Sequence, residues 1–274
     1  MRLTVLASGS GGNSILVEAE HTRLLVDAGL SAREIAKRIE RSSLSARLED
    51  VQALCVTHEH NDHASGAATL GSAGIALYAT AGTARAARLK NTQLLGPVQE
   101  TRIGCLTITP VLLPHDAVEP IGLVLTDERG KVGILTDCGY PSVEVAAAFA
   151  GCDLLVLEAN HELHLLRSGG YQPTLKRRIG GRRGHLSNEQ AGEILRLRGR
   201  PGPKVLILAH LSEKSNRPRL ARTAVERAIF PMGMRPKILI ASQSRPTASV
   251  AVGKGRVSVL AEPDARQLSL SFPD

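Results

Sequence analysis

Aromatic side chains are scarce in this chain of 274 residues: phenylalanine, tyrosine and tryptophan make up 2%, and tryptophan is absent. A nucleic acid bound by this protein would have few aromatic side chains on which its bases could stack. Binding would therefore depend on phosphate contacts and show little sequence preference. Cysteine is also rare, and the four cysteines are widely spaced without a Cys-x-x-Cys pair. This spacing predicts reduced thiols in a cytoplasmic protein and argues against a disulfide framework.

Long apolar runs are missing as well. No run approaches twenty residues, which argues against a membrane span, and the first residues lead into a strand pattern without a secretory signal. No internal repeat or low-complexity tract is present. The net charge is +8, from 34 lysines and arginines against 26 acidic residues. Such a basic balance favours polyanionic partners such as nucleic acid, although composition alone does not decide this.

Apolar runs alternate with amphipathic segments along the chain. We expect strands at residues 3–7, 15–18, 24–27, 51–57, 106–109, 122–126, 133–137, 154–158, 205–210 and 238–241. We expect helices at residues 31–41, 64–71, 81–90, 142–149, 187–198 and 218–229. The order predicts an α/β fold in which sheets lie between helix layers. Residues 1–260 should form one domain, and the last thirty residues, above all the tail 261–274, are expected to be disordered.

The segment from Thr57 to His63 carries the strongest chemical signal. It holds His58, His60, Asp62 and His63 directly after an apolar run that is typical of a buried strand. In extended geometry His58 and His60 project to one side, whereas Asp62 and His63 fall in the turn that begins the next helix. One short loop can therefore supply ligands to two metal ions. Imidazole with carboxylate suits zinc, and also manganese or iron.

Histidine or aspartate also ends later apolar runs. His115 with Asp116, then Asp137, then His210 stand at three such positions. One of these residues alone is more often a structural end-cap. Ligands of open α/β sheets collect at the carboxyl ends of strands, so four strand ends that finish this way predict one shared site.

A glycine-rich segment covers residues 8–14, Ser-Gly-Ser-Gly-Gly-Asn-Ser. It matches neither common phosphate-loop pattern, which favours a tight turn between two strands. Backbone N–H groups of the turn presented to a phosphate remain the alternative.

With these motifs the chain resembles the metallo-β-lactamase-fold hydrolases over nearly its whole length. The pattern Thr-His-x-His-x-Asp-His is shared across that superfamily and names no substrate. Further segments resemble the YycJ/WalJ branch, which is similar to RNase Z and to the phosphonate-pathway phosphodiesterase. These segments are residues 8–14, 27–29, 115–117, 136–139, 158–161, 184–188 and 210–212. The resemblance implies an αββα sandwich with two mixed sheets between helix layers, and 5′ exonuclease action on DNA.

The resemblance also implies roles for individual positions. The ligands of a first metal ion would be His58, His60 and His115, and those of a second Asp62, His63 and His210, with Asp137 bridging both. His185 matches the histidine that protonates the leaving group, and Glu158 matches the acid that orients it. Two divalent ions are therefore the expected cofactors. A histidine such as His185 could also be a satisfied core residue, but its position between Gly184 and a helix start favours a mobile loop of an active site.

Substrate contacts are expected in two segments that precede His185 in the sequence. Asn160 and His161 follow Glu158 in a segment shared with the family. A basic strip, which contains Lys176, Arg177 and Arg178, precedes His185 and is expected to hold phosphates of a nucleic-acid backbone.

The C-terminus carries a separate pattern, Gln267-Leu-Ser-Leu270-Ser-Phe272. It resembles the peptides with which bacterial replication and repair proteins dock on the sliding clamp, so Gln267, Leu270 and Phe272 are candidate partner contacts. The alternating apolar residues would equally suit an edge strand.

These observations predict a single-domain metallohydrolase, a phosphodiesterase that trims DNA ends. A small-molecule phosphodiesterase or thioesterase with the same metals is the alternative enzyme. A nucleic-acid-binding protein with a structural metal site is a third interpretation. The expected bridging aspartate and separate acid argue against it, because structural zinc is usually closed by cysteine and histidine.

Overall fold

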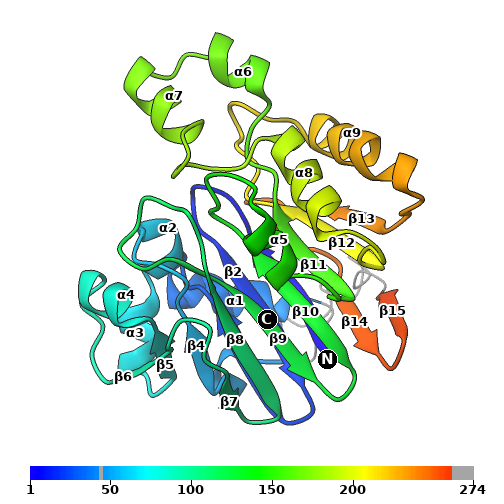
Figure 1. The fold of residues 1–274 in the computed structure, drawn as a ribbon. Helices are drawn as coiled ribbons and strands as arrows, with labels where there is room; N and C mark the ends of the chain where they lie inside the picture. The colour runs from blue at the N-terminus through cyan, green and yellow to red at the C-terminus, as the bar shows by residue number, and fades with distance from the viewer. Residues whose placement is uncertain (43–45, 261–274) are drawn as a thin grey trace, which may run out of the picture.

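A computed structural model describes residues 1–42 and 46–260 of the chain (Figure 1). Two β-sheets lie face to face, and helices cover their outer faces (Figure 1). The predicted αββα sandwich with two mixed sheets is therefore confirmed. The predicted clamp peptide, with Gln267, Leu270 and Phe272, lies outside the described residues and stays a prediction.

The first sheet has the strand order β15-β14-β1-β2-β3-β4-β5-β6. Its strands are β1 (Arg2–Ala7), β2 (Ser14–Ala19), β3 (Thr22–Val26), β4 (Ala53–Cys55), β5 (Ala76–Ala79), β6 (Thr92–Leu94), β14 (Val250–Gly253) and β15 (Arg256–Val259). β1, β2 and β3 are antiparallel neighbours, and β3 to β6 run parallel. The parallel half places the carboxyl ends of β3 and β4 at the same edge of the sheet.

The second sheet has the order β13-β12-β11-β10-β9-β8-β7. Its strands are β7 (Thr101–Ile103), β8 (Leu106–Leu112), β9 (Ile121–Asp127), β10 (Gly130–Leu135), β11 (Leu154–Glu158), β12 (Val205–Ala209) and β13 (Lys237–Ile240). β10 to β13 are parallel. Because both faces of β11 and β12 are buried, these strands appear as continuous apolar runs in the sequence.

Helices cover the outer face of each sheet. The helices are α1 (Ala32–Glu40), α2 (Asn61–Ala64), α3 (Ala67–Ser72), α4 (Ala81–Ala86), α5 (Val143–Ala148), α6 (Leu163–Ser168), α7 (Pro173–Ile179), α8 (Asn188–Arg198) and α9 (Pro218–Ile229). Ile35 and Ile39 of α1 pack with the first sheet, and Ile194 of α8 and Val225 of α9 pack with the second. A third apolar cluster fills the space between the sheets. Each fully buried aliphatic side chain contributes roughly 1.5–3 kcal/mol.

The structure corrects several predicted elements. The helix expected at residues 64–71 is two short helices, α2 and α3, and strands β5, β6 and β7 were not predicted. The expectation of disorder was wrong for residues 250–259, where β14 and β15 form a hairpin that extends the first sheet beside β1. Val250 and Val252 are buried in the core between the sheets, which outweighs the turn-rich composition of this segment.

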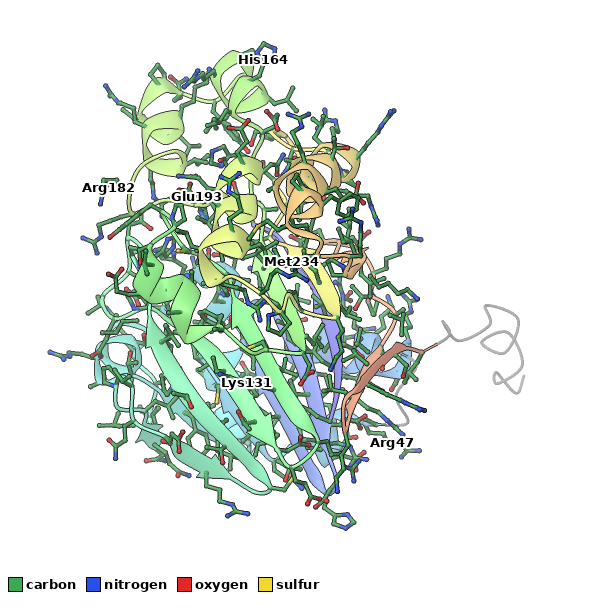
Figure 2. All side chains as sticks on the ribbon, turned by 45° about the vertical axis from the view of Figure 1, so that its right-hand side comes forward. Arg47, Lys131, His164, Arg182, Glu193 and Met234 are labelled. Carbon is green, nitrogen blue, oxygen red and sulfur yellow. The ribbon has the colours of Figure 1, made fainter. Side chains whose placement is uncertain are left out.

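Helices α6 and α7 were not predicted either. They belong to residues 162–184, which we call the arm and which stands away from the body of the sandwich (Figure 1). His164 of the arm is exposed and lies at the top of the molecule in Figure 2, as expected of a surface residue. Among the described residues no helix is long and apolar enough to cross a membrane.

Candidate metal centre

The histidines and aspartates predicted as metal ligands lie together at one rim of the sandwich. They stand just beyond β4, β8, β10 and β12, so both sheets contribute. The structure brings together all seven predicted ligands: His58, His60, Asp62, His63, His115, Asp137 and His210.

Three imidazoles form the first group. Nε2 of His58 lies 3.1 Å from Nδ1 of His60, and Nε2 of His115 lies 3.3 Å from that same atom. His58 and His115 are buried, whereas His60 is half-buried at the edge of the pocket. Nδ1 of His115 donates to the carbonyl oxygen of Gly184 at 2.8 Å. That bond turns Nε2 of His115 toward the other two rings.

Two imidazoles and a carboxylate form the second group. Oδ2 of Asp62 lies 3.5 Å from Nε2 of His63 and 3.4 Å from Nε2 of His210. Asp137 lies between the two groups, with Oδ2 at 3.1 Å from Nε2 of His63 and Oδ1 at 3.8 Å from Nε2 of His115. Its carboxylate is therefore placed to contact an ion in either group.

Two buried atoms of this cluster, Oδ2 of Asp137 and Nε2 of His210, make ion-pair contacts but no hydrogen bond with the described residues. Buried polar atoms are rarely left unpaired, and an ion is one of the usual reasons. The described candidate groups contain only histidine and carboxylate, and no cysteine belongs to them. Nitrogen and oxygen donors of this kind fit zinc, manganese or iron.

Asp27 holds the ring of His63 in place. Its Oδ2 accepts from Nδ1 of His63 at 2.7 Å, and its Oδ1 accepts from the backbone N–H of Thr57 at 2.8 Å. Asp27 is not among the site residues predicted from the sequence. Its position is nevertheless a usable signal, because Asp27 directly follows β3 just as the ligand candidates follow their strands.

His185 and Glu158 form a close pair beside these groups. Nδ1 of His185 lies 2.7 Å from Oε1 of Glu158, and Nδ1 of His210 lies 3.1 Å from the same oxygen. Burial raises the pKa of Glu158, but the neighbouring imidazoles of His185 and His210 outweigh burial and hold that pKa at about 2. Glu158 is therefore ionised at neutral pH and fixes the ring of His185, whose other nitrogen is left for the pocket.

The charges of the metal-free site are arranged in opposite pairs. Burial lowers the pKa of His63, but the carboxylates of Asp137 and Asp27 raise it well above the usual range. Burial likewise lowers the pKa of His210, and Asp137, Asp62 and Glu158 raise it to about 10. The carboxylates therefore favour the charged form of both histidines. A metal ion would replace these protons as the positive charge among the carboxylates.

The backbone of the site is strained at three residues. Asp27, Asp137 and His210 adopt positive φ angles of 62°, 60° and 55°. Such angles are uncommon outside glycine and cluster at functional sites. Asp27 and His210 directly follow β3 and β12, and Asp137 follows β10 after one residue, so the strained angle turns each side chain from the sheet edge toward the common centre. Nothing in the local sequence indicated this conformation.

The glycine-rich segment is a tight turn, as its composition favoured. The backbone N–H of Gly9 donates to Oδ1 of Asn13, and that of Gly11 donates to Oε1 of Gln243. Nδ2 of Asn13 lies 2.9 Å from Nε2 of His63, so the turn braces the second group. The neighbouring Gly29 has no room for a side chain, since a Cβ there would lie 1.8 Å from the carbonyl oxygen of Asp62.

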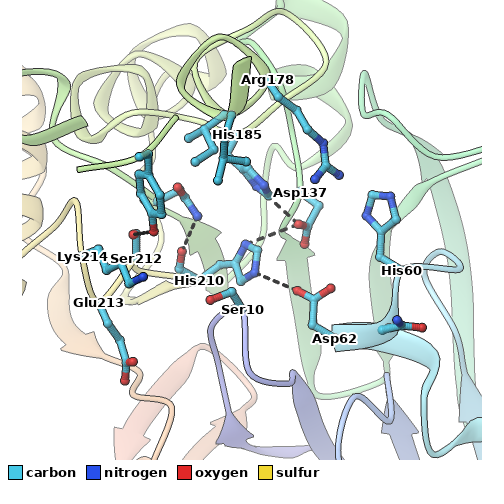
Figure 3. A pocket seen from close by; sticks show the side chains of 15 residues that line it. Ser10, His60, Asp62, Asp137, Arg178, His185, His210, Ser212, Glu213 and Lys214 are labelled. Atoms are coloured by element: carbon cyan, nitrogen blue, oxygen red, sulfur yellow. Dashed lines mark hydrogen bonds and ion pairs between the residues drawn. The ribbon is translucent and has the colours of Figure 1, made fainter. Parts of the chain in front are cut away.

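A pocket of about 540 Å³ opens over the cluster (Figure 3). His60, Asp62, Asp137, His185 and His210 line its floor, and Arg178 reaches toward His60 from the arm above (Figure 3). The side chain of Asn160 also lines the pocket, and its Nδ2 donates to the carbonyl oxygen of His210 at 2.9 Å.

His161 lies outside this lining. Its side chain is fully buried, and neither ring nitrogen has a partner among the described residues. Burial lowers the pKa of His161 to about 4, so the ring is neutral. This geometry gives no support to the predicted contact of His161 with substrate, which stays a prediction.

Several members of the basic strip have partners within the chain. Lys176 donates to the carbonyl oxygen of Arg167, and Arg178 forms an ion pair with Asp116. Arg182 stacks on the ring of Tyr140, and Arg183 donates to two carbonyl oxygens of the loop that carries His115. Arg177 is exposed on α7. The strip therefore holds the arm in place as well as carrying charge.

Comparison with protein families identifies the class. Residues 22–211 match the sequence profile of the Beta-lactamase superfamily domain. Because this match spans more than half of the chain, the protein belongs to that superfamily of metallo-β-lactamase-fold hydrolases. The fold implies divalent metal ions, and the histidine and aspartate groups at the rim fit them.

Within the superfamily the chain is similar to two curated proteins. It is 37% identical over 234 residues to Exodeoxyribonuclease WalJ of Streptococcus pneumoniae serotype 2 (strain D39), covering 80% of this chain and 85% of that protein. It is 31% identical over 245 residues to Exodeoxyribonuclease YycJ of Bacillus anthracis, covering 85% and 90%. Among solved structures, the short form of human tRNase Z superposes with a TM-score of 0.60 at 17% identity, covering 90% of this chain and 99% of that chain. The last match shows a shared fold only.

Proposed function

We propose that this protein is a metal-dependent phosphodiesterase that acts on nucleic acid, most of all a DNA exonuclease that works from the 5′ end in repair or processing. One observation carries the proposal: seven metal-ligand candidates converge beside a separate Glu158–His185 pair in an open pocket. The similarity to two proteins named exodeoxyribonucleases supports DNA as the substrate.

Two ions would be held by residues of both sheets. His58, His60 and His115 would hold one ion, Asp62, His63 and His210 the other, and Asp137 both. When bound, such ions stabilise charge that develops on phosphate oxygens and lower the pKa of a water toward neutrality. Oδ2 of Asp137 and Nε2 of His210, which make no hydrogen bond among the described residues, support this assignment, since both atoms belong to the ligand groups.

His185 would supply the proton for the leaving group. Its Nδ1 is committed to Glu158, so Nε2 is the atom that can carry a proton into the pocket. In the hydrolysis, the oxygen of a water bonds to phosphorus and releases a proton to solvent, the bond to the leaving oxygen breaks, and that oxygen takes the proton from Nε2, which solvent then restores. The carboxylate of Glu158 holds the ring in this orientation.

The deciding experiment compares substrates. The metal-loaded protein should shorten end-labelled DNA stepwise from the 5′ end, faster than RNA of the same sequence. It should hydrolyse bis-p-nitrophenyl phosphate slowly. Turnover of that small ester with none of DNA would instead favour the small-molecule phosphodiesterase. Turnover of thioesters alone would favour the thioesterase.

The charge on the outside of the arm should hold the DNA backbone. We expect the double variant Lys176→Ala, Arg177→Ala to bind DNA with a weaker dependence on salt. The slope of log affinity against log salt concentration should become shallower by ~0.7–0.9 for each phosphate that the protein no longer neutralises. Turnover of bis-p-nitrophenyl phosphate should change little, because the ligand groups remain intact. Binding titrations at several salt concentrations measure the slope. An unchanged slope would move the DNA-binding surface away from the arm.

The carboxylate of Asp27 should matter for metal affinity although it lies behind the ligand His63. In Asp27→Asn, His63 loses its charged partner, and metal affinity should fall roughly 10–100-fold. The amide oxygen can still accept from the N–H of Thr57, so the fold should persist. Competition with a chelator measures the affinity, and Asp153→Asn, whose carboxylate pairs with Lys204, is the control. Equal affinities of the two variants would contradict the role of Asp27.

A further inference from the structure

The arm that covers the pocket is anchored unequally at its two sides. Residues 162–184 leave the body after Glu158 and return to it at His185, so they pass over the candidate metal groups (Figure 3). On one side the arm contacts the loop that carries His115. On the other side it contacts the loop that follows His210.

The side at His115 is held by charged contacts. Nε and Nη2 of Arg178 donate to the two carboxylate oxygens of Asp116, at 2.5 and 3.2 Å. Arg183 adds bonds to the carbonyl oxygens of His115 and Ala117, at 3.0 and 3.2 Å. Two-point contacts of arginine with a carboxylate are among the stronger and more directional polar interactions in proteins.

The backbone of the arm is also in tight contact with the body on this side. A Cβ on Gly139, which follows the strand of Asp137, would lie 2.3 Å from the carbonyl oxygen of Arg182. The ring of Tyr140 packs under the guanidinium of Arg182, 4.2 Å from it. The arm and the loop of His115 therefore form a continuous wall at this end.

On the opposite side the root of the arm is held by the backbone N–H of Glu162, which donates to the carbonyl oxygen of Ser215 at 2.8 Å. Farther along the arm, the side-chain contacts between described residues on this side are weak. The hydroxyl of Tyr171 lies 3.5 Å from that of Ser212, the limit of a hydrogen bond, and Nζ of Lys214 lies 5.5 Å from the centre of the Tyr171 ring. Lys214 is exposed. Such contacts can be exchanged for contacts with a bound strand at little cost.

We propose that the Arg178–Asp116 pair closes one end of the pocket and makes the site select a chain end over a continuous strand. The inference rests on the proposed nuclease function and adds the residues that determine end selection. A strand enters on the side of Tyr171 and Lys214 and stops at the wall of Arg178 and Asp116.

Size and charge both support this arrangement. A pocket of about 540 Å³ lies in the range of sites that take one small ligand, and a through-going strand would need an exit at the far end. Asp116 lies at that end, with Oδ1 3.7 Å from Nε2 of His60. Its carboxylate repels a phosphate that would continue past the cluster. The same carboxylate offsets the positive charge of Arg178, which would otherwise attract that phosphate.

The test compares circular and linear single-stranded DNA of one sequence, with the metal-loaded full-length protein. Wild-type protein should degrade the linear strand at least about a hundredfold faster than the circle. Arg178→Met keeps the bulk of the side chain but removes the ion pair, and should lower this ratio about tenfold or more. Arg167→Met removes the same charge from an exposed position on α6 of the arm without touching Asp116, and its ratio should match that of the wild type.

Asp116→Asn is the second variant, and it should lower the ratio as Arg178→Met does. Metal content and melting temperature are measured for each variant, so a variant that fails to fold is recognised. A wild-type protein that cuts the circle as fast as the linear strand overturns the proposal. So does a ratio that is unchanged in both variants of the ion pair. Failure to degrade the linear strand contradicts the proposed nuclease function itself, and the end-selection proposal falls with it.

Discussion

Replacing Asp137 by alanine should abolish most activity and lower bound metal from about two ions per chain to one or fewer. Its carboxylate lies between the two ligand groups, within 3.1 Å of His63 and 3.8 Å of His115. The same change removes one carboxylate partner from each of the buried residues His63 and His210. Removing one partner of a buried ion pair costs ~3–5 kcal/mol, so the melting temperature should fall as well.

Asp137→Asn separates the loss of metal and activity from the loss of stability. Asparagine tolerates the positive φ of this position, and its amide retains the shape of the carboxylate. Elemental analysis of protein purified without chelator measures the metal. Two ions still bound in Asp137→Asn would show that the carboxylate does not bridge. A wild-type protein without stoichiometric metal, even after reconstitution, would falsify the dinuclear site.

Replacing His185 by alanine should lower kcat on DNA by roughly two to four orders of magnitude, the range for a general acid. The bound metal should stay, because the seven ligand candidates are untouched. The loss should be smaller on bis-p-nitrophenyl phosphate, since p-nitrophenolate leaves without needing a proton. This difference between substrates is the expected signature of a proton donor.

His164→Ala is the matched control, because His164 is exposed at the top of the arm (Figure 2). Metal analysis has to accompany the kinetics. His185 lies close enough to Asp137, Glu158 and His210 to be counted among candidate ligands. If metal content falls together with activity, His185 is a ligand and the proton must come from another group.

The sandwich and the cluster could be predicted from the sequence because both depend on local patterns. Buried parallel strands such as β11 and β12 appear as apolar runs, and a residue that follows such a run lies at the sheet edge. This rule predicted that His115, Asp137 and His210 lie close to the loop of His58. It also fits Asp27, which is not among the predicted site residues.

Other features depend on contacts that no local pattern reveals. Helices α6 and α7 are six and seven residues long, too short for a clear apolar period, and only packing against the body fixes them. Arg178 and Asp116 lie 62 residues apart in sequence, so the strip of basic residues gave no sign of the ion pair. The positive φ of Asp137 and His210 is likewise imposed by the surrounding structure.

The ligand candidates come from both sheets: His58, His60, Asp62 and His63 follow a strand of the first, and His115, Asp137 and His210 follow strands of the second. An ion held by residues of both acts as a cross-link between two halves of the chain that otherwise adhere through apolar side chains. The free energy of binding the ion is then also free energy of holding the sheets together. Loss of the ions would therefore weaken the contact between the two sheets at this rim and also abolish the activity.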